Sequence, residues 1–197
     1  MKKVLLVALF SVSLLSYAQY TLPSESPRAS STQQFSLSQV SVDYGRPGVK
    51  GRKVFGDLVP YGKVWRAGAN SSTKITFGQN VLFQGKKVAK GTYGLFIEPN
   101  ENSWRVILSK DSQSWGTAYN KENDLLDVVI TPEKTNQKIE WYTMNLTPVS
   151  KNELELEILW ENTKGKVSIK ADNEKGLTQI EEKLGEIRQI ERNAPKN

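Results

Sequence analysis

A stretch rich in basic residues and glycines, residues 46–66, has the composition of an anion-binding loop. Its sequence is RPGVKGRKVFGDLVPYGKVWR, which holds six basic residues and one acid, Asp57. Guanidinium groups can hold a carboxylate, phosphate or sulfate through two parallel hydrogen bonds, and lysines add point charges. The glycines permit the backbone conformations that a tightly shaped loop needs. The six basic residues are Arg46, Lys50, Arg52, Lys53, Lys63 and Arg66.

The same charges allow two other interpretations, and the sequence leaves both open. The long side chains can lie over the core and pair with Asp57 or with the glutamates of residues 153–161, which makes the loop an end cap. Alternatively, the loop is a polar lid over an uncharged ligand.

Two tryptophans and an asparagine add to the candidate site. Trp65 and Trp115 lie in glycine-bearing segments without a strand period, where an indole can stack on a sugar or plug one end of a sandwich. Asn70 can bind a ligand or occupy a turn. The candidate ligand-binding residues are therefore Arg46, Lys50, Arg52, Lys63, Trp65, Arg66, Asn70 and Trp115.

The chain contains no histidine and no cysteine, which excludes several kinds of active site. A Ser-His-Asp triad, a cysteine nucleophile and a metal site built from these two residue types are ruled out. We expect no metal and no cofactor. Paired carboxylates remain available for glycoside hydrolysis, because acids lie near predicted loops and strand ends. These acids are Asp43, Asp57, Glu98, Asp111, Asp124 and Asp127.

The first eighteen residues have the pattern of a secretory signal peptide, with two lysines, an apolar run and a small-x-small end. We predict cleavage between Ala18 and Gln19 and a periplasmic or extracellular protein. No cysteine follows the apolar run, so we expect no lipoprotein, and no later segment predicts a membrane span. Loss of Lys2 and Lys3 lowers the net charge from +6 to +4, which indicates no nucleic-acid partner.

After a flexible Pro/Ser-rich leader, residues 19–32, polar and apolar residues alternate with the period of β-strands. The clearest hairpin joins alternating residues 93–97 to alternating residues 104–108. Nine or ten such strands with brief turns predict an all-β domain over residues 33–170, an antiparallel β-sandwich or a jelly-roll-like barrel.

Two irregularities are predicted within these strands. A slip of the period at Ser38 and Gln39 indicates a β-bulge or a bend. Residues 154–160 alternate between an apolar face and a face of glutamates, and residues 162–165 are predicted to turn into the next strand.

Residues 171–197 are predicted to form an amphipathic C-terminal helix and a tail. We expect its apolar stripe to pack on the sandwich, and the alternative is pairing with another chain. The sequence does not set the oligomeric state. The stripe consists of Leu177, Ile180, Leu184, Ile187 and Ile190.

Three motifs carry a resemblance: YGRPGVKGRKVFGDLVPYGKVWRAGAN (residues 44–70), GKKVAKGTYGLFIEP (residues 85–99) and WRVILSKD (residues 104–111). They resemble the domain of unknown function 2911 (DUF2911), found in secreted or periplasmic proteins typical of the Bacteroidetes, over about residues 33–169. The resemblance implies a secreted β-rich domain and brings no activity, substrate or catalytic residue. The family motif matches Arg46, Pro47, Lys50, Gly51, Arg52, Gly56, Trp65, Arg66, Gly68 and Asn70.

We therefore expect a non-enzymatic module that binds a small anionic or carbohydrate-like ligand, or an envelope partner, through the Arg46–Asn70 loop. A carboxylate-dependent, glycoside-type hydrolase and a structural or adhesive envelope module are the alternatives. Binding requires the loop arginines to converge on an open cleft, whereas an end cap pairs them with carboxylates. A hydrolase requires two acids roughly 5–10 Å apart in a cleft.

Overall fold

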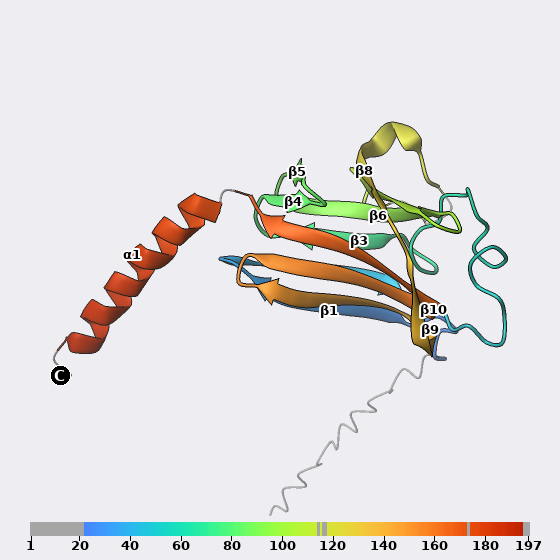
Figure 1. Ribbon diagram of the computed structural model, residues 1–197, viewed down its shortest axis with the longest axis horizontal. Coiled ribbons are helices and arrows are strands. Elements are labelled where there is room, and N and C mark those ends of the chain that lie inside the picture. Colours follow the sequence, from blue (N-terminus) through green and yellow to red (C-terminus); the bar gives the residue numbers. More distant parts are fainter. Residues whose placement is uncertain (1–21, 114, 116–117, 173, 195–197) are drawn as a thin grey trace, which may run out of the picture.

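The computed structural model describes residues 22–113, 115, 118–172 and 174–194 and shows a sandwich of two antiparallel sheets, not a closed barrel (Figure 1). The predicted β-sandwich is confirmed, whereas the predicted signal peptide lies outside the described residues. The larger sheet has six strands, in the order β1-β2-β3-β6-β7-β8. These strands are β1 (Arg28–Phe35), β2 (Ser38–Gly45), β3 (Thr73–Phe77), β6 (Gly91–Pro99), β7 (Trp104–Ser109) and β8 (Asp124–Ile130).

The smaller sheet has four strands in the order β5-β4-β10-β9 and is dominated by one long hairpin. The two strands of this hairpin pair along most of their length, with register shifts near Glu161. A short 3₁₀ helix, η1 (Lys121–Asn123), precedes β8 in the other sheet. The strands of the smaller sheet are β4 (Val81–Phe83), β5 (Lys86–Val88), β9 (Glu133–Ser150) and β10 (Glu153–Ala171).

The core lies between the sheets because alternate side chains of each strand point inward. In β3, for example, Thr73, Ile75 and Phe77 are buried while their neighbours are partly exposed. Trp104 and Trp160 are each 1% exposed, so the prediction that these two indoles belong to the core is confirmed. The predicted hairpin of residues 93–108 is also confirmed as β6 and β7.

The ordered domain begins earlier than predicted, because β1 starts at Arg28, inside the expected leader of residues 19–32. β1 is an edge strand whose side chains are mainly polar, and it is held by backbone pairing with β2 from Arg28↔Gly45 to Phe35↔Ser38. Apart from Ala29 and Phe35, the inward positions of β1 are polar, so the strand shows no hydrophobic period, which is why composition indicated a leader.

Two predicted irregularities are different in the structure. The slip at Ser38 and Gln39 is not a bulge but follows the tight turn of the β1–β2 hairpin, where Ser36 has a φ of 52°. The predicted turn at residues 162–165 was wrong, because β10 continues through it. Glu161 has a φ of 53° at a register shift, so the strand bends there and remains paired with β9.

The C-terminal helix, α1 (Glu174–Asn193), extends away from the sandwich (Figure 1). The prediction that its apolar stripe packs on the sandwich was wrong beyond the first turn. Leu177 packs against the core, but Ile180, Leu184 and Ile187 are exposed, and Ile190 is 70% exposed. Pairing with another chain stays a prediction. Within the described residues, no helix has the length and apolar character needed to cross a membrane.

Tyr119 covers the face of β6 that points away from the core. Its ring lies 5.1 Å from the ring of Phe96, and its hydroxyl donates to Asp124 Oδ2 at 2.7 Å. Burial is the larger cause and this hydrogen bond the second, and together they raise the pKa of Tyr119 to about 12. Because the unfolded value is about 10, the resulting stability is complete below that pH and is lost as the pH rises towards 12.

We expect Tyr119→Phe to flatten the fall in the free energy of unfolding between about pH 10 and about pH 12, because the variant has no proton to lose there. Urea titrations at several pH values measure this slope. Tyr61→Phe is the control for the loss of a phenol hydroxyl, because Tyr61 is 41% exposed. An unchanged slope in Tyr119→Phe would contradict the placement of its hydroxyl.

Candidate functional site

A cleft of about 380 Å³ lies beside the segment that joins β2 to β3. Its walls come from this segment, from Glu25 and Ser26 before β1, and from Trp160 on β10. Three parts of the chain that are far apart in sequence therefore form one site. Of the candidate ligand-binding residues, the cleft is lined by Lys50, Arg52, Trp65, Arg66 and Asn70.

The segment between β2 and β3 is a shaped loop because its backbone is bonded to both sheets. Near its start, Val49 N–H donates to Glu140 O of β9 at 2.8 Å. Further along, Trp65 and Ile97 of β6 exchange two backbone hydrogen bonds of 2.7 and 2.8 Å. The buried Val54 fixes the part between them to the core. The cleft thus has rigid walls, as a binding site requires.

An aromatic cluster forms the floor of the cleft. The ring of Trp65 stacks on that of Trp160 at 5.7 Å and meets Tyr142 edge-on at 5.1 Å. Trp65 Nε1 donates to Gly68 O at 2.9 Å, which fixes the orientation of the indole. Trp65 is half-buried, so it packs on the core and also lines the cleft. The two functions proposed for this indole from sequence, plug and stacking surface, are compatible.

Arg66 is a half-buried cation without a protein anion. Its Nε is buried and has no hydrogen-bond partner, and within the described residues its guanidinium has no ion-pair partner. The backbone bonds of the adjacent Trp65 hold it beside the cleft. A buried donor of a charged group is costly when it is left unpaired. A ligand that accepts a hydrogen bond from Arg66 would remove this cost.

Arg52 and Lys50 add positive charge to the cleft. Arg52 donates from Nη2 to Gly48 O at 2.7 Å and from Nε to Val49 O at 3.0 Å, so the loop backbone orients its guanidinium. Lys50 Nζ lies 3.0 Å from Glu25 Oε2, and the Lys50 side chain is 48% exposed and that of Glu25 90% exposed. An exposed ion pair of this kind is weak. Lys50 is thus available to a ligand.

Asn70 closes the wall near Arg66 in a left-handed conformation, with a φ of 63°. Its Nδ2 donates to Ser26 O at 3.4 Å, which joins the loop to the segment before β1. The turn prediction for Asn70 is therefore confirmed, and the residue also lines the cleft.

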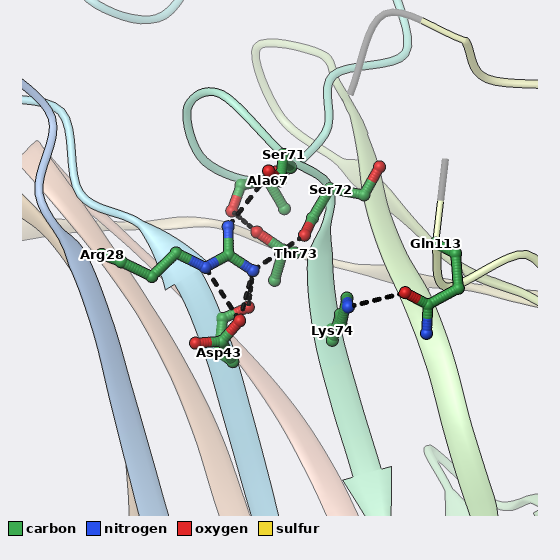
Figure 2. Close-up of polar contacts among 8 residues, drawn as sticks. All are labelled: Arg28, Asp43, Ala67, Ser71, Ser72, Thr73, Lys74 and Gln113. Carbon is green, nitrogen blue, oxygen red and sulfur yellow. Dashed lines mark hydrogen bonds and ion pairs between the residues drawn. The ribbon is translucent and has the colours of Figure 1, made fainter. Parts of the chain in front are cut away.

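Arg28 fixes the far end of the loop, as Figure 2 shows. Its guanidinium donates to the Asp43 carboxylate and to the carbonyl oxygens of Ser71 and Ser72 at 3.2 and 3.1 Å. Beside it, the buried Thr73 hydroxyl donates to Ala67 O at 2.7 Å (Figure 2). These bonds hold the turn that carries Arg66.

The cleft lies within the part of the chain that matches a family model. The model described as "Protein of unknown function (DUF2911)" matches residues 26–169. The chain belongs to the DUF2911 family. The match includes every lining residue of the cleft except Glu25, and it ends before α1. Comparisons with curated proteins and with solved structures gave no significant match.

Three candidate residues of the DUF2911 domain are not brought to the cleft. Arg46 instead donates to Tyr142 O at 3.0 Å and to Thr143 Oγ1 at 3.1 Å, so it joins the loop to β9. Lys63 is exposed outside the cleft lining. Trp115 is 61% exposed and also lies outside it.

Three lining residues of the DUF2911 cleft were missed by the sequence reasoning. Glu25 and Ser26 were assigned to a leader, and Trp160 was assigned to the core alone because its strand alternates regularly. Only the family match, which starts at residue 26, gives a sign that the segment before β1 belongs to the domain. The sequence does not distinguish Trp160 as a lining residue, because a buried indole beside a cleft alternates with its neighbours as any core residue of a strand does.

Proposed function

We propose that the protein is a binding module that holds a small anionic ligand in this cleft. The observation that carries the proposal is Arg66, a half-buried guanidinium whose Nε has no partner and which lines the cleft together with Lys50 and Arg52. A ligand anion would supply the missing acceptor through charge-assisted hydrogen bonds. Export through the predicted signal peptide would place this function in the periplasm or outside the cell.

The proposal is supported against the end-cap alternative by the partners of the loop arginines. An end cap would pair these guanidiniums with carboxylates, but Arg46 and Arg52 donate to backbone carbonyls or a hydroxyl. Arg66 has no carboxylate partner within the described residues. Arg52 and Arg66 therefore line the open cleft without a carboxylate partner among the described residues.

The acids of the cleft do not favour the alternative of a glycoside hydrolase. Hydrolysis by this route needs two carboxyl groups about the scissile bond, and the described lining of the cleft contains a single acid, Glu25. Among the other acids considered from sequence, Asp43 is bonded to Arg28 and Asp124 to Tyr119. We therefore do not propose hydrolysis.

We expect Arg66→Gln to weaken binding of an anion at least tenfold, which corresponds to about 1.4 kcal/mol, because a hydrogen bond to a charged group is lost. A thermal-shift screen against phosphate, sulfate and simple carboxylates identifies the anion, since a ligand of the native state raises the melting temperature. Calorimetric titration then measures the affinity of both proteins.

Lys63→Gln is the matched control, because it removes the same charge from the same loop outside the cleft. It should bind the anion as the wild type does, and both variants should melt within a few degrees of the wild type without ligand. Equal weakening by the two substitutions would indicate a nonspecific charge effect. A collapse of the fold in Arg66→Gln would show that this arginine is architectural.

A further inference from the structure

The geometry points to a sugar ring that carries a carboxylate, a hexuronic acid, as the ligand of the cleft. This inference rests on the proposed anion-binding function and specifies its ligand class. It requires three features of one cleft: donors for a carboxylate, an aromatic surface for a ring, and acceptors for hydroxyl groups.

Among the described residues that line the cleft, the buried polar atoms without a partner are both donors. The hydroxyl of Tyr142, which packs beneath the lining and is not part of it, is also without a partner in the described part of the chain. Arg66 Nε and Trp160 Nε1 are both buried, and neither has a hydrogen-bond partner within the described residues. Both residues line the cleft, and Trp160 is 1% exposed. Guanidinium and indole nitrogens cannot accept hydrogen bonds. Two unsatisfied donors beside one cleft favour a ligand group with several acceptor sites, and a carboxylate is such a group.

The aromatic floor favours a ring rather than a bare anion. Trp65 is half-buried, lines the cleft, and is held in place by its stack on Trp160 and by its bond to Gly68 O. A fixed indole beside polar groups gives a sugar ring an apolar surface on which to lie. Inorganic phosphate or sulfate would use the cations and leave this surface unused.

The rim of the cleft carries oxygens that can accept hydrogen bonds from sugar hydroxyls. They belong to the carboxylate of Glu25, the hydroxyl of Ser26 and the amide of Asn70, which all line the cleft. Glu25 is bonded to Lys50 through Oε2, so its second oxygen remains able to accept. An aromatic carboxylate would lack donors for this rim. The cleft volume of about 380 Å³ lies in the lower part of the range of small-molecule sites.

Titrations of tryptophan fluorescence test the inference with galacturonate and glucuronate, their neutral counterparts galactose and glucose, and benzoate and inorganic phosphate. At least one uronate should bind tenfold more tightly than its neutral sugar, than benzoate and than phosphate. If benzoate or phosphate binds as tightly as the better uronate, the assignment of a sugar ring to the ligand is overturned, while the proposed anion binding stands. Neutral sugars equal to the uronates, or no binding by any probe, would overturn both the inference and the proposed function.

Two substitutions at Arg66 make the test specific to the carboxylate. Arg66→Gln should lower uronate affinity to that of the neutral sugar, and Arg66→Lys should retain only part of the preference, because an ammonium lacks the two-pronged geometry. Lys63→Gln should leave the uronate preference unchanged. A uronate preference that survives Arg66→Gln in a folded variant would overturn the assignment of the carboxylate to this residue.

Discussion

Trp160→Ala is expected to lower the free energy of unfolding by about 3–5 kcal/mol, because it removes a large buried ring and leaves a cavity. Trp160 is 1% exposed, and its ring contacts those of Trp65 at 5.7 Å and Tyr142 at 5.5 Å. Its loss also removes the support of the indole on which we propose the ligand lies. Chemical denaturation measures the change in stability.

Trp115→Ala is the control for this prediction. Trp115 is 61% exposed, so its removal should change the free energy of unfolding by no more than about 0.5 kcal/mol. The same variant tests ligand binding, because Trp115 was a candidate from sequence and lies outside the cleft lining. Similar losses of stability in the two variants would contradict the burial that separates these indoles.

Gly45→Ala is expected to be the other strongly destabilising substitution, at a cost of about 1–3 kcal/mol or more. A Cβ atom at this position would lie 2.0 Å from Ala69 O. The obstacle is backbone, and Ala69 N–H donates to Gly45 O at 3.3 Å, so neither segment can move without breaking their contact. Because this contact holds the loop beside Arg66, we expect ligand binding to be lost as well.

Gly185→Ala provides the comparison, because a Cβ there would meet no atom within 4 Å. In α1 this substitution should be neutral or stabilising by up to about 1 kcal/mol, since alanine favours helix more than glycine does. Thermal and urea unfolding of the two variants measures both effects. A Gly45→Ala variant with wild-type stability and binding would contradict the close approach of the two segments.

Alternating strands could be predicted from sequence because each buries one face. Apolar residues alternate with others along residues 93–97 and along residues 104–108. These two segments form the paired strands β6 and β7. β1 was missed because its side chains are polar apart from Ala29 and Phe35, and the strand is specified mainly by backbone pairing with β2. Hydrophobic periodicity indicates burial, so it gives little signal for a strand that is held mainly by backbone hydrogen bonds.

The helix and the long strand show two further limits of the pattern. The stripe of α1 predicts an amphipathic helix, and that helix is present, but the pattern does not state what the stripe contacts. In β10, Asn162 and Gly165 have the composition of a turn. Pairing with β9 keeps the strand extended there, so tertiary contacts override the local preference.

The candidate site was predicted in part, because charge and glycine content identify a loop but not the direction of its side chains. Lys50, Arg52 and Arg66 line one cleft, whereas Arg46 is held by a carbonyl of β9 that no local pattern reveals. Trp160 joins the site from a strand that is distant in sequence. Only the three-dimensional arrangement could bring it beside the loop.

The position of β10 at the end of the sandwich sequence has a consequence for folding kinetics. β4 and β5 are synthesised early, but the neighbour of β4 is β10, where Phe83 pairs with Ile169. A lone two-stranded hairpin is marginal in water, and closing so long a loop is slow. The smaller sheet, and with it the cleft that includes Trp160, therefore assembles only after nearly the whole domain has been synthesised.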